Sequence, residues 1–527
     1  MGDAGEVGPA AGEKISIWGG RWFHVLLIVM SAIGARVPFY LALKPVWSSD
    51  TASYTLAYYF WAHHQFFAGE RTPGYPIFLG LAQWVHGAPA GILLSFPVAY
   101  SVLHWQALLD IAAVVALYFV MREWMKIRPA IAVIASIFLV NVAGLCIEEM
   151  QLLNMSLSFA AVTAIVCLYA GFLKRISENK KTLALGFGIG IAMAIGVLIR
   201  PEVLIFSVLL VVGTMALRLA MPERGVQLLS SALLMMVGLA PLLLLWMTWM
   251  YVGIGQFRVT TLDGWNKSRT VYNLFDRVEP QDRALGEVLA HSYTLQRAQG
   301  KNVNVREHIF LAFDELRGHY LEFPIEHPVS RPSELNAWAI KVAHEWFGFQ
   351  RVPCEVSNTM SCFENMRNKI DLGDYIGEVS TRLMFHHPFS WLRNVLADWF
   401  EEGFNFDYID EKPAVVGYHA ITVDGSSYIA RPGLEKALEW AVRIEAPLLT
   451  VAYLLAIGCV VFGFRLVRAD RERAWLVVIL AFAAVGSMAV MCALEGFNRI
   501  YNLPYLSVFV LCASYLPGSF VRRSRTQ

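Results

Sequence analysis

Residues 183–220 read LALGFGIGIAMAIGVLIRPEVLIFSVLLVVGTMALRLA, two long apolar runs that are separated only by Arg200, Pro201 and Glu202. A bilayer core about 30 Å thick requires roughly 20 mostly apolar helical residues to cross it. Each run is close to that length, and a proline such as Pro201 can occupy the first turn of the second helix. The stretch therefore predicts two transmembrane helices joined by a very short polar turn.

The same pattern of long apolar runs recurs along the chain. It predicts about ten spans, near residues 22–43, 97–121, 128–147, 154–173, 183–199, 202–220, 226–255, 445–466, 474–494 and 501–518. Of the 527 residues, 56% are hydrophobic and only 16% are charged, whereas soluble domains carry about 25% charged residues. The first run is too long for the apolar part of a cleaved signal peptide. We therefore expect an α-helical polytopic membrane protein.

Charged residues are concentrated in one region, 256–440, which is about twice as densely charged as the rest of the chain. We expect this region to be a water-exposed domain of mixed helical and extended structure, with helices near 304–320 and 374–385. It separates a first membrane module, residues 1–255, from C-terminal membrane helices, residues 441–527. The net charge of +1 gives no support for nucleic-acid binding through bulk charge.

Basic residues are distributed unevenly over the connections between the predicted spans. One set of connections is rich in Lys and Arg, and the alternate short connections carry only Lys44, Arg71, Arg200 and Arg499. By the positive-inside rule, the rich set and both termini are cytoplasmic. The loop 44–96, the turn 148–153, the domain 256–440 and the turn 495–500 then share the outer side. The compact loops favour a bacterial inner membrane.

The first outer loop, residues 44–96, carries the first candidate site residues, Asp50 and Arg71. Two aromatic or apolar stretches in it, 54–67 and 77–85, are too short to span and should lie in the membrane interface. Pro73, Gly74 and Pro76 are expected to hold the segment after Arg71 out of a helix. A carboxylate and a guanidinium at a membrane surface could serve proton abstraction and anion binding. The alternative is a helix-capping Asp50 and a snorkelling Arg71.

Further charged candidates lie at the outer ends of other spans. Glu148 and Glu149 follow the third span, either as functional acids or simply exposed to headgroup water. Arg200 and Arg499 could converge on a lipid phosphate, because arginine donates paired hydrogen bonds to that group. An internal pair between Arg200 and Glu202 is the alternative for Arg200. Asp110 is a costly charge within the second span. It lies too far inward for this site and is expected to pair with a neighbouring helix.

Cysteines and motifs limit the remaining chemistry. Cys354 and Cys362 are the only cysteines of the outer domain, and their proximity in an oxidising compartment predicts a local disulfide. No P-loop, dinucleotide fingerprint, H-E-x-x-H or C-x-x-C motif occurs. The first outer loop also lacks a D-x-D pair of acids. We therefore expect no cofactor and no divalent metal.

In their order along the chain, these features resemble the GT-C superfamily of integral membrane glycosyltransferases. The likeness is greatest to the protein mannosyltransferase and aminoarabinose transferase branch, which uses polyprenyl-phosphate sugars. The family pattern has an acidic residue after the first span, here Asp50, and an interfacial helix with spaced aromatics, here Tyr54 and Tyr58. A basic residue before a proline-containing turn follows, here Arg71, and then a second acidic position, here Glu148 or Glu149.

The resemblance continues at two turns further along the chain. Arg200-Pro201 resembles the arginine-proline turn of these proteins, and residues 498–504 resemble their closing R-Y-x-x-P pattern with Ile500 inserted. It covers about the first 220 residues and the last 30, while residues 256–440 resemble no domain beyond sharing the position of the mannosyltransferase lumenal domain. The missing D-x-D separates the chain from the metal-dependent oligosaccharyltransferase branch.

The resemblance implies transfer of a sugar from a polyprenyl-phosphate donor to an outer acceptor hydroxyl, with inversion and without metal. It implies Asp50 as general base, and Arg71 with Arg200 and Arg499 as the residues that hold the lipid phosphate. Glu149 or Glu148 would hold hydroxyls of the sugar or acceptor, or orient Asp50. The acceptor would be a cell-envelope glycan, lipid or protein.

Two other classes of function remain open from the sequence. A flippase or transporter of a lipid-linked anion could use the same arginines, but it would commonly show an internal repeat, and none is visible. A membrane scaffold that displays the outer domain would leave the grouping of outer acids and arginines unexplained.

Overall fold

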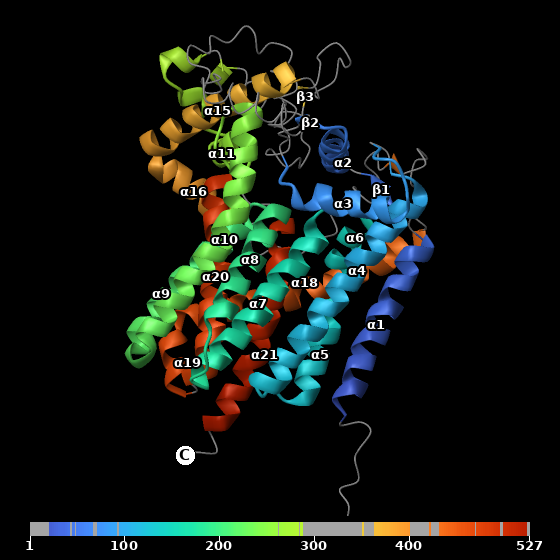
Figure 1. The fold of residues 1–527 in the computed structure, drawn as a ribbon. Coiled ribbons are helices and arrows are strands. Elements are labelled where there is room, and N and C mark those ends of the chain that lie inside the picture. The colour runs from blue at the N-terminus through green and yellow to red at the C-terminus, as the bar shows by residue number, and fades with distance from the viewer. Residues whose placement is uncertain are drawn as a thin grey trace, which may run out of the picture.

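The computed structural model forms a helical bundle with smaller helices and short strands at one end (Figure 1). The structure describes residues 20–42, 45–47, 49–66, 71–91, 94–261, 263–283, 285–287, 350–351, 363–400, 421–422, 432–469, 471–495 and 499–523. Within these ranges, eight helical segments are long and apolar enough to cross a bilayer, and Leu183–Ile199 and Asn502–Leu516 are shorter apolar helices. The predicted helical, polytopic membrane fold is confirmed.

The bundle follows the predicted apolar runs closely. Its helices are α1 (Arg21–Ala42), α4 (Phe96–Phe119), α5 (Pro129–Val140), α6 (Ala143–Met150), α7 (Met155–Ser177), α8 (Leu183–Ile199), α9 (Val203–Ala220), α10 (Gly225–Ile254), α18 (Pro432–Val461), α19 (Gly463–Ala469), α20 (Arg471–Glu495) and α21 (Leu506–Arg523). A π-helical turn, η2 (Val120–Trp124), continues α4, and the 3-10 turns η3 (Pro222–Arg224) and η10 (Arg499–Tyr505) precede α10 and α21. The start of α1 and the end of α21 lie at the same end of the bundle (Figure 1).

The third predicted span is broken into α5 and α6. The helix stops at Val140, and α6 begins again at Ala143 after Asn141 and Val142. Every residue of α6 is buried, and a helix that is buried all round requires protein on every side. The second half of this span is therefore enclosed by the bundle rather than exposed at the membrane boundary.

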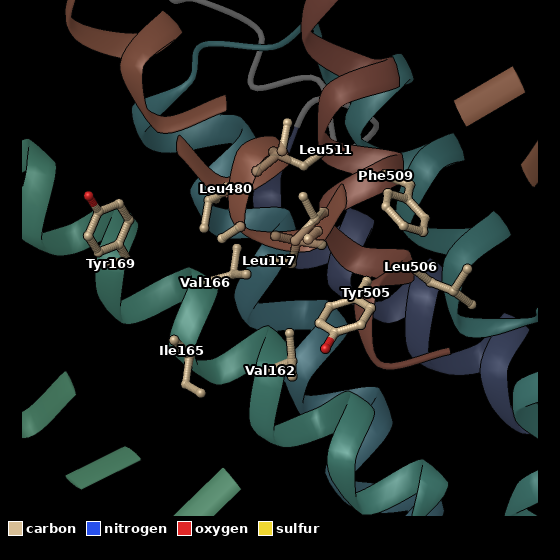
Figure 2. Packing of buried hydrophobic residues seen from close by; sticks show 14 of the residues in the cluster. Leu117, Val162, Ile165, Val166, Tyr169, Leu480, Tyr505, Leu506, Phe509 and Leu511 are labelled. Atoms are coloured by element: carbon tan, nitrogen blue, oxygen red, sulfur yellow. The ribbon is translucent and has the colours of Figure 1, made fainter. Parts of the chain in front are cut away.

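The core is centred on the C-terminal segment. Each residue from Asn502 to Cys512 is buried, and Figure 2 shows side chains of this segment packed with residues of α4, α7 and α20. The labelled side chains are Leu117, Val162, Ile165, Val166, Tyr169, Leu480, Tyr505, Leu506, Phe509 and Leu511. Elsewhere, glycines let helices approach closely, as where Gly190 of α8 meets the backbone of Met235 in α10.

Two helices of the first loop lie across the other end of the bundle, α2 (Ser49–Ala62) and α3 (Gly74–Val85). Both are too short to span, as expected. The prediction that Pro73, Gly74 and Pro76 keep this segment out of a helix is wrong, because α3 begins at Gly74. Pro76 lies in the first turn, where an α-helix has no backbone acceptor for its N–H groups, so the helix accommodates it.

Parts of region 256–440 cover the same end of the bundle. They include α11 (Asp263–Thr270), η4 (Phe275–Arg277), η5 (Pro280–Asp282), α15 (Phe363–His386) and α16 (Pro388–Asp398). The predicted helix at 374–385 is confirmed within α15, whereas 304–320 lies outside the described residues. Two short pairings join this region to the first loop: β1 (Val46–Trp47) pairs antiparallel with β4 (Ile421–Thr422), and β2 (Gln65–Phe66) pairs parallel with β3 (Gln350–Arg351). Strands therefore flank α2 on both sides in sequence.

Candidate active site

Asp50 is the second residue of α2, and the start of this helix is tied to the turn that follows the two glutamates. The Thr51 hydroxyl donates a hydrogen bond of 3.1 Å to the carbonyl oxygen of Leu152. Thr51 is buried, so the first turn of α2 is fixed against the connection between α6 and α7. The backbone at Asp50 is therefore held beside the segment that carries Glu148 and Glu149, although the side chain of Asp50 is outside the described part.

Arg71 contacts the same helix one turn further on. Its Nε donates a hydrogen bond of 3.0 Å to the Ser53 hydroxyl, and its guanidinium carbon lies 5.2 Å from the centroid of the Tyr54 ring. A cation over an aromatic face is attracted by the ring quadrupole. Because residues three apart share a helix face, Asp50 and Ser53 lie on one face of α2. The structure thus brings the positions of two predicted site residues together.

The Arg71 turn is locked onto the last turn of α8. The Thr72 hydroxyl donates to the Ile199 carbonyl oxygen over 3.4 Å, and the Asn154 amide donates to the same oxygen over 2.8 Å. A Cβ at Gly74 would lie 2.6 Å from the Leu198 carbonyl oxygen, so only glycine fits without moving backbone. The turns that follow Arg71 and precede Arg200 are therefore packed against each other.

Arg200 itself is buried and internally paired. Its Nε lies 3.3 Å from a carboxylate oxygen of Glu202, and its guanidinium also contacts the sulfur of Met155. The internal ion pair considered from the sequence is therefore present. A buried guanidinium that is already paired fixes the corner between α8 and α9, and it would need to rearrange before it could bind a lipid phosphate directly.

The two glutamates are enclosed by protein, so the interpretation that they are exposed to headgroup water is wrong. Only 1% of Glu149 is exposed, because α6 is surrounded by other helices. Its carboxylate accepts two hydrogen bonds from Arg36 of α1, one of 2.7 Å from Nε and a second from Nη2. Arg36 also donates to the carbonyl oxygens of Ala32 and Val140. Both carboxylate oxygens of Glu149 are thus engaged inside the bundle.

Asp110 belongs to the same buried cluster. Its carboxylate accepts a hydrogen bond of 2.6 Å from the Ser156 hydroxyl and interacts electrostatically with Arg36 and Glu149. The sequence correctly indicated a partner on a neighbouring helix, but it placed Asp110 too far from the glutamates. The break before α6 explains the difference, since it allows Glu149 to lie inside the bundle. Two acids and one guanidinium then share one buried site.

A chain of hydrogen bonds connects this cluster to α3. The Tyr75 hydroxyl donates to the Gln106 side-chain oxygen over 2.9 Å, and the Gln106 amide donates to the carbonyl oxygens of Glu149 and Gln151 over 3.5 and 3.4 Å. The Gln151 amide in turn donates to the Glu148 carboxylate over 3.3 Å. Burial, with smaller contributions from Tyr54 and Glu148, raises the pKa of Tyr75 well above its usual value. Tyr75 therefore remains a proton donor in this chain.

Arg36, Gln106 and Tyr75 were missed from the sequence. Arg36 interrupts an apolar run, and a charge at bilayer depth is itself a signal, since such residues face the protein interior and pair. Arg499 is the first residue of η10, which packs against α7, and its side chain is outside the described part. Cys354 and Cys362 also lie outside the described residues. No group of three or more metal-ligating side chains occurs within the described ranges.

Comparisons with known proteins found similarity in structure alone. No family model and no curated protein matches the chain. An Archaeoglobus fulgidus oligosaccharyltransferase, AglB, solved with an inhibitory peptide and a dolichol-phosphate, is 12% identical over 96% of this chain, with a TM-score of 0.41. The chain spans about half, 51%, of its length. ArnT from Cupriavidus metallidurans, solved with undecaprenyl phosphate, is 14% identical, with 91% of this chain and 77% of ArnT covered and a TM-score of 0.33.

Both solved proteins belong to the GT-C superfamily that the sequence resembles, as predicted. At these identities and TM-scores the likeness is remote, and no residue of this chain takes a role from them.

Proposed function

We propose that this protein is a membrane glycosyltransferase that moves a sugar from a polyprenyl-phosphate carrier to an acceptor hydroxyl. The observation that supports the proposal is the convergence of the first turn of α2, which carries Asp50, with Arg71 on one face of that helix. The two helices of this loop are too short to span and lie across one end of an apolar bundle. Together these features support a site for a lipid phosphate at the membrane surface, served by the Arg71 guanidinium and by Asp50 on the same helix face.

A polyprenyl-phosphate sugar carries its own leaving group, so the chemistry needs few protein groups. Asp50 removes the proton from the acceptor hydroxyl as the acceptor oxygen forms its bond to the anomeric carbon. The bond between that carbon and the phosphate oxygen breaks, and the phosphate leaves with the electron pair. Because the acceptor attacks from the side opposite the leaving group, the anomeric configuration inverts. The proposed reaction requires no metal and no cofactor.

Arg71 is proposed to stabilise the departing phosphate. Preorganised charge aimed at developing negative charge is often the largest contribution to catalysis, and the planar guanidinium suits phosphate geometry. The hydrogen bond to Ser53 and the contact with the Tyr54 ring fix the plane of this group. Arg499 is proposed as a second cation for the same phosphate, because it opens η10 against α7, whose first residue Met155 contacts Arg200.

The buried residues are proposed to position this site rather than to touch the substrate. Glu149 is engaged by Arg36, and Arg200 is engaged by Glu202. Glu148 is joined through Gln151 to the chain of hydrogen bonds that reaches α3. These contacts hold two segments in place. The connection after α6 contacts the first turn of α2, and the end of α8 contacts the turn after Arg71.

The proposal is tested with purified protein in nanodiscs that is given a panel of polyprenyl-phosphate sugars and a crude cell-envelope acceptor extract. Sugar release from the lipid is measured for the wild type and for Asp50→Asn. We expect the substitution to reduce turnover by about 10²–10⁴-fold, the usual contribution of a general base, while lipid binding is retained. The matched control is Asp276→Asn, the same chemical change at an exposed carboxylate, which should leave turnover unchanged.

Turnover that survives in Asp50→Asn would remove this residue from the chemistry. Lipid binding without turnover for any donor would instead favour a flippase or transporter of the lipid-linked anion.

A further inference from the structure

A cleft of about 690 Å³ lies where α10 ends and α11 meets α15. These elements are at the same end of the bundle as α2 and α3 (Figure 1). The cleft is lined by the segment after α10 and by one face each of α11 and α15, including Gln256, Phe257, Arg258, Lys267, Glu378 and Arg382. None of these residues has a role in the proposed transfer chemistry.

The walls of the cleft are held by close packing and by a charged pair. Gly264 of α11 and Gly377 of α15 meet backbone to backbone, since a Cβ on Gly377 would lie 2.7 Å from the Gly264 Cα. Arg258 donates two hydrogen bonds to Asp374, of 2.7 and 3.2 Å, and the Gln256 amide donates a third of 2.7 Å. Asp374 therefore holds the side chains of Arg258 and Gln256 in fixed positions at the cleft.

Gln256 retains an unused acceptor that is buried at this site. The side chain is 8% exposed, and its Oε1 accepts no hydrogen bond from any part of the chain that the structure describes. The Nε of Arg258 likewise has no acceptor within those residues. Buried polar atoms are satisfied in the great majority of native structures. An unused acceptor and an unused donor on two residues that line the cleft therefore point to a ligand that offers both.

The charges of the cleft nearly cancel, which indicates an uncharged ligand. Arg258 is paired with Asp374, and Arg382 is paired with Asp282 over 2.6 Å. Lys267 and Glu378 add one further charge of each sign. Phe257 adds an apolar surface, since 51% of this residue is exposed. Mixed donors and acceptors beside an exposed ring match the hydroxyls and the C–H face of a sugar.

We propose that this cleft binds a glycan, the part of the acceptor that is distant from the reacting hydroxyl. The inference rests on the proposed glycosyl transfer, because that function supplies the reason for a glycan at this end of the bundle. Packing joins the cleft to the α2 site: the Trp61 ring of α2 lies 6.0 Å from the Trp246 ring of α10, and the Trp246 indole donates to the Val259 carbonyl oxygen over 2.8 Å.

The spacing indicates the size of the acceptor. Trp61 lies eleven positions after Asp50 on α2, about 16 Å at the helical rise of 1.5 Å per residue. A monosaccharide cannot occupy the cleft and reach Asp50 together. The acceptor that benefits from the cleft is therefore an oligosaccharide or a longer glycan, whereas a single sugar binds without it.

The test measures glycan binding directly, without turnover. Linear trisaccharides of mannose, glucose, galactose and arabinose are added one at a time to the full chain in nanodiscs, and binding is followed by saturation-transfer NMR. We compare the wild type with Phe257→Ala, Phe257→Tyr and Gln256→Leu; in Gln256→Leu, Asp374 keeps both hydrogen bonds from Arg258. Phe389→Ala removes an equally large exposed ring, 87% exposed on α16 and outside the cleft.

We expect at least one trisaccharide to bind, and its Kd to rise about tenfold in Phe257→Ala and in Gln256→Leu, the effect of one lost stacking or hydrogen-bonding partner. Phe257→Tyr and Phe389→Ala should bind as the wild type does. Failure of every trisaccharide to bind, or binding that survives both cleft substitutions, would overturn the proposal.

Asp50→Asn separates this inference from the proposed function. It should lose turnover and still bind the same trisaccharide. Glycan binding in a protein that transfers no sugar from any donor would leave the cleft in place and refute the transferase. Turnover in a protein whose cleft binds no glycan would support the transferase and refute the glycan cleft.

Discussion

The buried cluster of Arg36, Glu149 and Asp110 allows a quantitative test of whether Glu149 positions the site or takes part in the chemistry. Arg36 cannot lose its proton in a protein, and it is the only cation described in this cluster. Replacing it by methionine leaves two acids facing each other in the bundle. Breaking a buried pair in this way costs about 3–5 kcal/mol. Arg36→Met should therefore lose that much stability.

Glu149→Gln should cost less, because the structure leaves Arg36 a second acid beside it. Asp110 remains nearby, and glutamine can still accept one hydrogen bond from the guanidinium. We expect a loss of about 1–3 kcal/mol, the range for a lost buried hydrogen-bonding partner. The double variant Arg36→Met/Glu149→Met should recover most of the loss of Arg36→Met, since well-packed apolar residues replace buried ion pairs at little cost.

The assay is denaturant unfolding in mixed micelles, followed by tryptophan fluorescence, with turnover measured at a temperature where every variant is folded. Arg283→Met is the control. Arg283 and its partner Glu287 are both exposed, and exposed ion pairs contribute about 0–1 kcal/mol to stability. A Glu149→Gln protein as stable as the wild type that nevertheless loses turnover 100-fold or more, the scale of a lost acid or base, would refute the positioning role and return Glu149 to the chemistry.

Three further substitutions test the way the site is held. Gly74→Ala should lower both stability and turnover, because the added Cβ meets backbone atoms of the last turn of α8. A melting curve and the sugar-release assay measure the two effects, and a wild-type melting temperature would contradict the packing. Arg71→Lys should reduce kcat more than lipid binding, since lysine cannot both keep the hydrogen bond to Ser53 and donate paired hydrogen bonds to phosphate as a planar guanidinium does. Equal losses of kcat and of lipid binding would mean that Arg71 only recruits the lipid. Tyr75→Phe should cost about 1 kcal/mol through the lost bond to Gln106, measured by denaturant unfolding, and an unchanged midpoint would show that this hydrogen bond is not made in the membrane.

The membrane helices were predictable because an apolar run of span length is a local property of the sequence. The runs at 183–199 and 202–220 correspond within a residue or two to α8 and α9. The break between α5 and α6 was not predictable, since Asn141 and Val142 do not forbid a helix. It depends on what surrounds α6 on every side, and that is a tertiary property.

The site was predictable in its parts and not in its connections. Asp50 and Arg71 stand out as charges in an aromatic loop, but only the structure shows that Arg71 contacts α2 at Ser53, three positions after Asp50. The pairing of Arg36 with Glu149 joins residues 113 positions apart. No sequence period relates such residues, so Arg36 could be suspected as a charge at bilayer depth but not assigned a partner.

The arrangement gives α2 a function beyond carrying Asp50. Its first turn is fixed to the connection after α6 through Thr51, and its last turns are fixed to α10 through Trp61. The middle of α2 packs closely on α3 at Gly80, where any side chain would overlap the Tyr58 ring. The 14 residues of α2 span about 21 Å, with the proposed donor site at one end and the proposed glycan cleft beyond the other. Because both ends are anchored, the distance between base and cleft is set by the helix, so acceptor length rather than loop movement should determine which hydroxyl reaches Asp50.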